Sequence, residues 1–467
     1  MRTESNPMRN ERHFVFHCSQ RSFCFLLSPR CYDVVIPMRI ILLFLCSLSL
    51  AALGDTSVLS GYGELRHLAG TGNAKDANFW DPTFEGAHPL AVELSNPHDC
   101  GSDAFGRVYI VDKESHSVLR ISANGAVLTT VAGTHIAGDG PDSGTPATSV
   151  ALANPNGLHV LNNGTFYILD TDNAKIRRVT PDGNCSTVVH HPAGFGAGRG
   201  LWVSPDEQTI YFNGANVGGG LQAVMKWTPA TGATELTRLP HGSGSDGFGL
   251  GNLDVAPDGS VGITSLGNQL VYRFDGETSY VIAGTGSTSG TNGSGSVATE
   301  VALNRPRGIA FLPDGSYFIA TQKGGDVWWV DTSGIIHLFV QGAGSGNVNA
   351  GNGQPWTVAG DKIAEPRAVH LATNGDLLIT TNDRGFIRAV DNVCLPIVPT
   401  PTLRSLDGEL AFDWQAAYKS GLLLESSESP AGPWSIETAP NDSAAILPLD
   451  GPSRFYRLRA TVLSGGR

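Results

Sequence analysis

A set of basic and amide side chains is the first candidate for chemistry in this sequence. Four prolines open segments of alternating apolar residues, and each ends a short motif: LSNP, LANP, LNRP or IAEP. The residue after each proline, with the matching positions behind Gly198 and Leu250, forms a set of six: His98, Asn156, Arg199, Gly251, Arg307 and Arg367. Guanidinium groups are planar forks that suit carboxylate or phosphate groups. If the fold brings this set together, we therefore expect a cationic site for an anionic ligand.

Two further polar residues directly follow members of this set. The next position is Gly or Ala in most segments, but it is Asp in one and Asn in another, namely Asp99 and Asn252. We include both in the predicted ligand-binding set. A structural role for the arginines is the alternative, in which each pairs with an acid of a neighbouring segment, such as Glu365 or Asp254.

Common catalytic motifs are absent from the sequence. It contains no Walker loop, no G-x-S-x-G, no H-E-x-x-H and no C-x-x-C. Two acids each have an arginine on the following predicted strand, Asp112 with Arg120 and Asp170 with Arg177. Because this arrangement recurs at equivalent positions, it favours structural ion pairs over metal ligands or catalytic acids.

The elements that must position these residues are repeated β units. In residues 130–182 an apolar run ends in Gly-Thr, a Gly- and Ser-rich stretch leads to Leu-x-x-Pro, and an Asn-Gly turn separates two strands. This pattern resembles the NHL repeat, which forms one four-stranded blade of a β-propeller. Six such units are present, with 58 residues between the first two prolines and 60 between the last two. The resemblance implies an all-β, six-bladed propeller with the residues after the prolines at the mouth of its central channel.

The sixth unit lacks its outer strand. Three expected strands end near Val390, and the chain then enters a Pro/Thr run. Glu64–Ala69 runs into Leu-Ala-Gly-Thr (68–71), which echoes Val-Ala-Gly-Thr at 131–134 and Ile-Ala-Gly-Thr at 282–285 in two other outer strands. We therefore expect it to close the ring and to cover an open sheet edge. The units exceed a minimal blade of roughly 40–45 residues. The surplus falls in three loops where we expect function: 135–150, 285–300 and 342–360.

An export signal precedes the repeats. Arg39 stands before an apolar run, and Ala52 and Gly54 are small residues at the expected cleavage positions. We expect the protein to be exported, to the periplasm, the cell surface or the extracellular space, without stable membrane insertion after cleavage. The expected parts are a non-native N-terminal extension (1–37), a signal peptide (38–54), the propeller (55–395), a Pro/Thr linker (396–402) and a small C-terminal β-sandwich-like domain that resembles fibronectin-like modules (403–461).

The charge of the chain disfavours nucleic acid as a partner. The formal net charge is −12, and loss of residues 1–54 with six arginines and three acids makes it −15. A negative protein body is repelled by nucleic acid and by anionic membranes.

Of the cysteines after the signal, Cys100 and Cys394 would be neighbours in a closed ring, where they form either a disulfide or buried thiols. Loop and strand tryptophans, including Trp80 and Trp356, are expected to be packing anchors, with stacking on sugars as the alternative.

These observations favour a binding module over an enzyme. We expect the propeller to bind a protein, peptide or glycan, anionic ones included, at the channel mouth and the long-loop face. Resemblance to six-bladed enzymes implies the alternative of a metal-dependent hydrolase or lyase of the gluconolactonase or amidating-lyase type. The former type would use Asp99, Asn156 and Asn252 for calcium. The latter is disfavoured because His98 is the one histidine at a zinc-ligand position, so no cofactor is predicted and calcium is the alternative.

Overall fold

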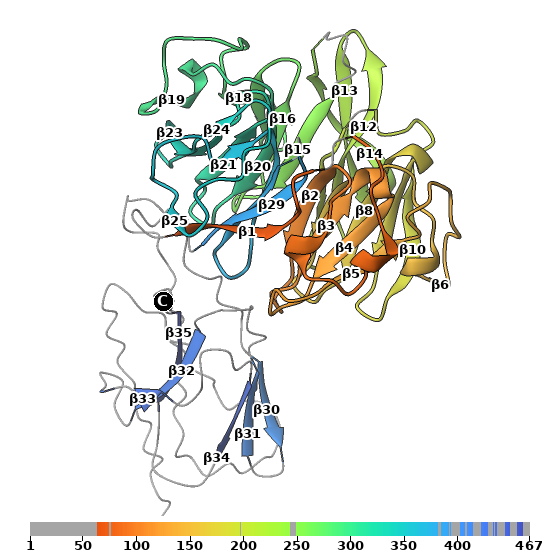
Figure 1. Ribbon diagram of the computed structural model, residues 1–467, viewed down its shortest axis with the longest axis vertical. Helices are drawn as coiled ribbons and strands as arrows, with labels where there is room; N and C mark the ends of the chain where they lie inside the picture. The colour runs from red at the N-terminus through yellow and green to blue at the C-terminus, as the bar shows by residue number, and fades with distance from the viewer. Residues whose placement is uncertain are drawn as a thin grey trace, which may run out of the picture.

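The chain forms a six-bladed all-β propeller (Figure 1). The computed structural model describes residues 63–73, 76–196, 198–242, 249–381, 384–391 and 393, together with short strands between 402 and 460. The expected extension, the signal, most of the linker and Cys394 lie outside the described residues. None of the helices in the described part is long or apolar enough to cross a membrane. They are single 3₁₀ turns: η1 (Pro82–Phe84), η2 (Pro89–Ala91), η3 (Lys113–Ser115), η4 (Ala147–Ser149), η5 (Thr171–Asn173) and η6 (Ala298–Glu300).

Each blade is an antiparallel sheet of four consecutive strands, except the last. Blade 1 contains β2 (Pro97–Ser102), β3 (Val108–Asp112), β4 (Ser117–Ile121) and β5 (Leu128–Gly133). Blade 2 contains β7 (Pro155–Val160), β8 (Phe166–Asp170), β9 (Lys175–Val179) and β10 (Asn184–His190). Blade 3 contains β11 (Leu201–Val203), β12 (Ile210–Gly218), β13 (Leu221–Thr228) and β14 (Gly232–Pro240). Blade 4 contains β15 (Leu250–Val255), β16 (Val261–Ser265), β17 (Leu270–Phe274) and β18 (Ser279–Ala283). Blade 5 contains β20 (Pro306–Phe311), β21 (Tyr317–Thr321), β22 (Val327–Val330) and β23 (Ile335–Val340).

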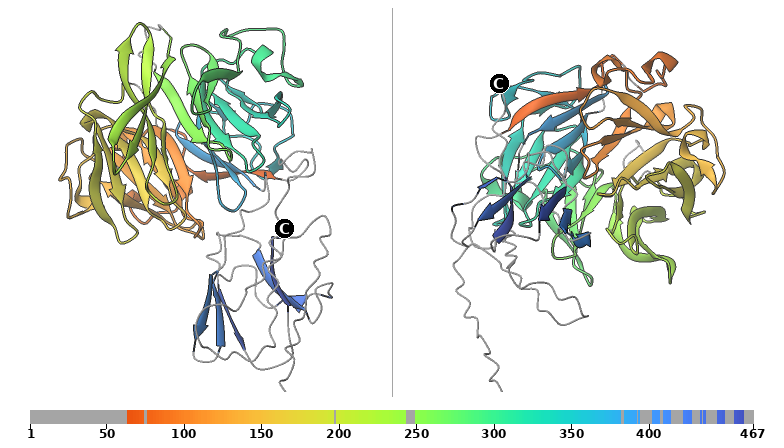
Figure 2. Two further views of the ribbon diagram at one scale, coloured as in Figure 1. Left: turned by 180° about the vertical axis from the view of Figure 1, so that it is seen from behind. Right: turned by 90° about the horizontal axis from the view of Figure 1, so that it is seen from below.

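Blade 6 joins the two ends of the propeller. It contains β27 (Pro366–Leu371), β28 (Leu377–Thr381) and β29 (Phe386–Val390), with β1 (Glu64–Ala69) as the next strand outward. β1 runs antiparallel to β29, with Leu65 opposite Val390. Figures 1 and 2 show this orange-red strand alongside the blue strands of the last blade. The predicted closure by Glu64–Ala69 is therefore confirmed, and it covers an edge that would otherwise be open.

The first strands of the six blades surround the central axis. Each packs against the first strand of the next blade, in the closed order β2, β7, β11, β15, β20, β27 and back to β2. Every residue of β20 is buried, whereas β14 at the outside of its blade is mostly exposed or half-buried. This gradient is expected because an inner strand has a neighbouring blade on each face.

The apolar core lies between the blades. Tyr109 of blade 1 shares one buried cluster with Leu158 and Phe166 of blade 2, and Tyr167 of blade 2 shares the next with Phe212 of blade 3. A blade has two apolar faces and cannot bury both alone, so the closed ring is the stable unit.

Short strands add to this framework. Three of them extend blades 2, 5 and 6 at their outer edges, and two form a separate parallel pair. They are β6 (Thr145–Pro146), β19 (Ser296–Val297) and β25 (Gln354–Pro355), and the pair β24 (Gly342–Ala343) and β26 (Ile363–Ala364). All five lie in or beside the long loops that the sequence predicted between blades.

The C-terminal region contains two three-stranded antiparallel sheets. The first comprises β30 (Thr402–Leu406), β31 (Glu409–Asp413) and β34 (Ala444–Pro448). The second comprises β32 (Leu422–Ser427), β33 (Ser435–Ile436) and β35 (Phe455–Ala460). The resemblance to fibronectin-like modules stays a prediction.

Candidate functional site

The backbone repeats one unusual geometry at the start of four inner strands. The residue before each blade-opening proline has a positive φ although none is glycine: 66° at Asn96, 48° at Asn154, 58° at Arg305 and 45° at Glu365. The residue after each proline is then skipped in the strand register, as where Pro97 lies opposite Asp112 and Asp99 opposite Val111. Such a bulge changes the direction of a side chain and is common beside functional sites. The bulge residues are His98, Asn156, Arg307 and Arg367.

Blades 3 and 4 lack the proline, but each has a residue at the position equivalent to the one after it. Arg199 lies just before β11, and Gly251 lies in an irregular part of β15. A Cβ at Gly251 would lie 2.5 Å from the carbonyl oxygen of Arg307 and 2.2 Å from Oγ1 of Thr264, so a larger residue does not fit. Five side chains are thus contributed by five blades, and we call them the axial cluster: His98, Asn156, Arg199, Arg307 and Arg367.

Three members of the axial cluster form a hydrogen-bonded chain across three blades. Nη1 of Arg367 contacts Nε2 of His98, and Nδ1 of His98 contacts Oδ1 of Asn156. Arginine can only donate, so Nε2 of His98 must accept, and the proton resides on Nδ1, which donates to Asn156. His98 is therefore a neutral connector. Burial, followed by repulsion from Arg367, Arg307 and Arg199, holds the pKa of His98 well below its usual value.

Arg307 is the most enclosed arginine of the axial cluster. Only 1% of its surface is exposed, and Nη1 donates to Oε1 of Gln322 at 2.8 Å. Its Nε and Nη2 atoms have no hydrogen-bond partner among the described residues. The alternative in which every arginine pairs with a neighbouring acid is thus wrong for Arg307. Asp254 instead accepts backbone N–H groups from Phe311 and Val255, at 2.7 and 2.8 Å.

One carboxylate does lie beside the axial cluster. Glu365 is bonded to Lys323, and its Oε2 lies 3.8 Å from Nη2 of Arg367. Positive charge nevertheless predominates. Burial, followed by the repulsion of Arg199 and Arg367, lowers the pKa of Arg307 well below its usual value, and burial followed by Arg367 lowers that of Arg199 to about 9. Arginine stays protonated in proteins. The lowered pKa values therefore reflect the free-energy cost of holding these buried positive charges together without an anion.

The two additional predicted residues meet at the axis. Nδ2 of Asn252 lies 3.5 Å from Oδ2 of Asp99, which also accepts the N–H of Leu158 at 3.2 Å. The other oxygen of Asp99 accepts the N–H of Cys100 at 2.9 Å. Burial raises the pKa of Asp99 to about 7, although these backbone hydrogen bonds act in the opposite direction. The axial cluster and the Asp99–Asn252 pair thus each bring together side chains from different blades, and their binding of a ligand stays a prediction.

The arrangement does not fit calcium. The oxygens of Asp99 already accept hydrogen bonds, Oδ1 of Asn156 accepts from His98, and Asn252 turns its N–H₂ group toward Asp99. Calcium takes six to eight oxygen ligands, and three guanidinium groups would repel it. Within the described ranges no three His, Cys, Asp or Glu side chains are grouped as a metal site.

A separate cavity of about 210 Å³ lies between β1 and blade 1, away from the axial cluster. Its charged groups already bond to one another or to nearby residues. Arg66 pairs with Asp376 at 2.9 Å, and Asp103 pairs with Arg107 at 2.6 Å. Because these pairs leave its charges compensated, we regard this cavity as a structural crevice and the axial cluster as the candidate site.

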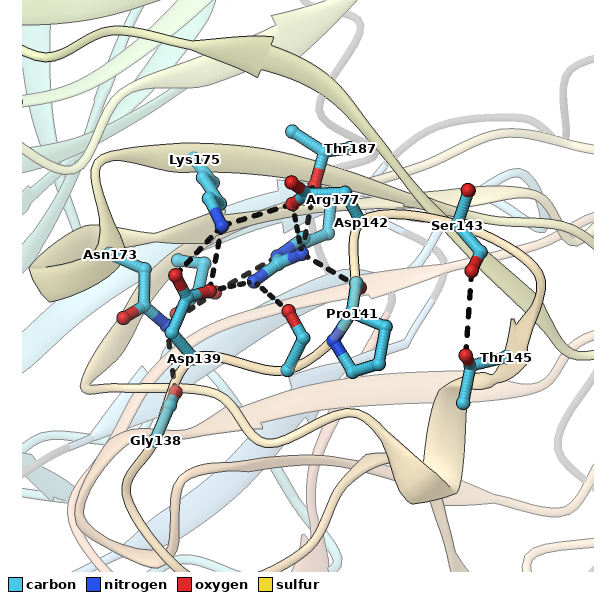
Figure 3. Close-up of polar contacts among 12 residues, drawn as sticks. Gly138, Asp139, Pro141, Asp142, Ser143, Thr145, Asn173, Lys175, Arg177 and Thr187 are labelled. Atoms are coloured by element: carbon cyan, nitrogen blue, oxygen red, sulfur yellow. Dashed lines mark hydrogen bonds and ion pairs between the residues drawn. The ribbon is translucent and has the colours of Figure 1, made fainter.

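The long loop after blade 1 is fastened by an ion-pair network (Figure 3). Arg177 is fully buried and donates to Asp170 at 3.1 Å, to Asp139 at 2.6 Å and to Asp142 at 3.1 Å. Lys175 adds a 2.8 Å pair with Asp139. The expected structural role of Asp170 and Arg177 is confirmed, and the network fixes a loop of the predicted functional face.

The matching pair in blade 1 was predicted wrongly. Arg120 lies opposite Tyr109, whereas Asp112 lies opposite Ser117, so Arg120 is on the other face of the sheet. The position equivalent to Arg177 is occupied by Leu119. Asp112 instead accepts a hydrogen bond from Oγ of Ser115 at 2.7 Å. The error is a shift of one residue, which reverses the face of a strand.

The tryptophans act as anchors, as expected. Trp80 stacks on His135 with ring centroids 3.9 Å apart, and Trp356 packs against Phe339 at 4.3 Å.

Cys100 has a buried thiol, and burial raises its pKa to about 12. Its predicted partner Cys394 lies outside the described residues.

Gln322 is the contributor that sequence reasoning missed. It follows β21, whose last residue Thr321 lies opposite Pro306. Residues after the second strand therefore lie beside residues that begin the first, and this pairing could have identified Gln322.

Comparison with known proteins supports the fold. No protein-family model and no curated protein matches this chain, so the assignment to NHL repeats stays a prediction. A protein of unknown function from Bacteroides thetaiotaomicron matches with a TM-score of 0.55 and 14% identity over 70% of this chain and 76% of that one. An auxiliary nutrient binding protein from the same species has a TM-score of 0.52, and one from Bacteroides ovatus 0.51, each at 14% identity with the same coverage.

Proposed function

We propose that this protein is an exported ligand-binding propeller that holds an anionic group of a protein, peptide or glycan at its axial cluster. The observation that carries the proposal is the convergence of Arg199, Arg307 and Arg367 from three blades, with two nitrogens of the buried Arg307 lacking an acceptor among the described residues. Buried charges are expensive unless they are paired, so an anion would stabilise this arrangement.

The surroundings are suited to binding rather than to chemistry. His98 and Asn156 are committed to orienting one another, and the arginines offer charge and hydrogen bonds but no nucleophile. The long loops beside the starts of the inner strands provide further contact area for a large ligand. Two solved propellers of similar fold are described as auxiliary nutrient binding proteins. At 14% identity they support the fold, and the proposal depends on the axial cluster itself.

An array of acidic and neutral peptides and glycans tests this proposal. The wild-type protein is compared with the double variant Arg307→Gln and Arg367→Gln. The matched control carries Arg178→Gln and Arg273→Gln, which remove the same charge from pairs with Glu207 and Asp258 outside the axial cluster. We expect the wild type and the control to retain acidic ligands that the first variant loses. Equal retention by all three proteins would contradict the proposal.

A further inference from the structure

The free atoms of Arg307 form one defined edge of its guanidinium group. In arginine, Nε–H and the Nη2 amino group point to the same side, where they donate two parallel hydrogen bonds. These are the two atoms of Arg307 without a partner among the described residues. The remaining nitrogen, Nη1, is held by Gln322 at 2.8 Å. The side chain is therefore oriented by one hydrogen bond and keeps its two-pronged edge available.

Another buried arginine shows what a purely structural arrangement looks like. Arg388, on β29, is also fully buried, and its three nitrogens donate to the carbonyl oxygens of Arg66, Lys362 and Ala350 at 3.2, 2.9 and 2.9 Å. Each of the three nitrogens of Arg388 thus has an acceptor. A buried donor without an acceptor is unfavourable, because it has lost its hydrogen bonds to water and gained none in return. The contrast indicates that Arg307 lacks an acceptor that comes from outside the chain.

We propose that Arg307 is the specificity-determining anchor of the site, and that its Nε–Nη2 edge takes both oxygens of one planar carboxylate group. This inference rests on the proposed function and narrows the anionic ligand to a carboxylate. Two coplanar acceptors match two coplanar donors, which gives geometric selection in addition to charge. A tetrahedral phosphate also accepts two hydrogen bonds from arginine, but lysine binds it well as a point charge, so a phosphate depends less on the fork than a carboxylate does. Selection for a carboxylate is therefore the property that depends on the fork.

Entry of the carboxylate requires movement of the neighbouring side chains. Nε and Nη2 of Arg307 are enclosed in this conformation. Arg199 and Arg367 are long side chains that keep small exposed fractions, 8% and 11%. They turn aside as the anion enters, and their charges then act on its outer side.

The experiment measures the affinities of three small probes for the full-length protein: acetate, methylphosphonate and the neutral isostere acetamide. Binding is followed through the Nε–H resonances of ¹⁵N-arginine-labelled protein and through the midpoint of thermal unfolding. The main variant, Arg307→Lys, keeps the charge and loses the fork. We expect it to weaken acetate binding at least about tenfold and methylphosphonate binding no more than about threefold. Acetamide should not bind to either protein.

A second variant protects the test against a failure of Arg307→Lys to fold. Gln322→Glu places a carboxylate next to Arg307, so the site acquires an internal anion. We expect a higher unfolding midpoint and weaker acetate binding. If acetate binds both variants within about twofold of wild type, the fork is not the anchor while the proposed function survives. If wild type binds neither anion, the proposed function fails and this inference fails with it.

Discussion

Asp99 and Asn252 occupy the same position in blades 1 and 4, which face each other across the axis, and their side chains meet there at 3.5 Å. In the other four blades this position is Gly or Ala: Gly157, Gly200, Gly308 and Ala368. A Cβ at Gly157 would lie 2.4 Å from the carbonyl oxygen of Arg199. The two exceptions therefore form a side-chain contact across the axis that the glycine or alanine of the other blades cannot form.

The buried carboxyl of Asp99 should make stability depend on pH. Its pKa is about 7 in the folded protein because of burial, against an ordinary value of 3.8. The folded state then holds a proton that the unfolded state has lost between about pH 4 and 7, so stability falls as the pH rises through this window. Asp99→Asn keeps an acceptor for Leu158 and removes this loss. We compare the unfolding free energy of Asp99→Asn with that of wild type at each pH. This difference should favour the variant by ~2–4 kcal/mol more at pH 8 than it does at pH 4. Guanidinium unfolding at both pH values measures the difference.

Asp258 is the control for this experiment. It is exposed, and hydrogen bonds from Ser260 lower its pKa to about 2. The stability from this group is present above about pH 4 and lost as the pH falls through the folded pKa, so Asp258→Asn should be less stable than wild type at neutral pH. Parallel pH profiles for Asp99→Asn and wild type would mean that Asp99 is ionised in the folded protein.

His98 should act through its neighbours rather than through a charge of its own. His98→Ala removes the acceptor of Arg367 and the donor to Asn156, and we expect acetate affinity to fall about tenfold, as for loss of a charge-assisted hydrogen bond. Gln can accept from one and donate to the other, so His98→Gln should recover affinity to within about threefold. Because the pKa of His98 lies well below its usual value, no step in wild-type affinity near pH 6.5 is expected. A step that disappears in His98→Gln would contradict the neutral form.

The buried Arg177 of the loop network should contribute far more to the unfolding free energy than Arg178, its neighbour on the same strand. Arg177→Met leaves Asp170, which is fully buried, without its cation, and we expect a loss of about 3–5 kcal/mol in unfolding free energy. Arg178 pairs with Glu207 while both side chains remain about a quarter exposed, so Arg178→Met should cost less than about 1 kcal/mol. Denaturant unfolding compares the two. Similar losses would show that the network does not stabilise blade 2.

Truncation of one buried leucine on β1 should weaken closure of the ring. Leu65 is fully buried on β1 and packs with residues of blades 5 and 6. Leu65→Ala should lower the unfolding free energy by about 2–5 kcal/mol. Val127, with 37% of its surface exposed, is the control, and Val127→Ala should stay within about 0.5 kcal/mol of wild type. Thermal and denaturant unfolding measure both, and equal values would indicate that β1 contributes little to closure.

Repetition in the sequence explains why the fold could be predicted and why the site could be predicted only in part. Four proline motifs located four of the six inner strands, and an apolar residue followed by Ala-Gly-Thr, shared with two other outer strands, identified Glu64–Ala69 as the closing strand. Four of the axial positions followed from the repeat because the same bulge recurs at each. Side-chain contacts that differ between blades could not be predicted from the repeat. The bond between Gln322 and Arg307, the position of His98 between Arg367 and Asn156, and the wrong pairing of Asp112 with Arg120 depend on side-chain direction and on single-residue register, which a repeat pattern does not specify.

The pairing of β1 with β29 also sets the order in which the molecule can be completed. Arg66 and Asp391, which bond across this seam, are 325 positions apart in the chain. β1 must therefore wait for its partner β29 until nearly the whole propeller has been synthesised. An outer strand with two buried residues, Leu65 and Ala69, is a hazard for aggregation during that interval. Closure of the ring between β1 and β29 can consequently occur only after β29 has been made.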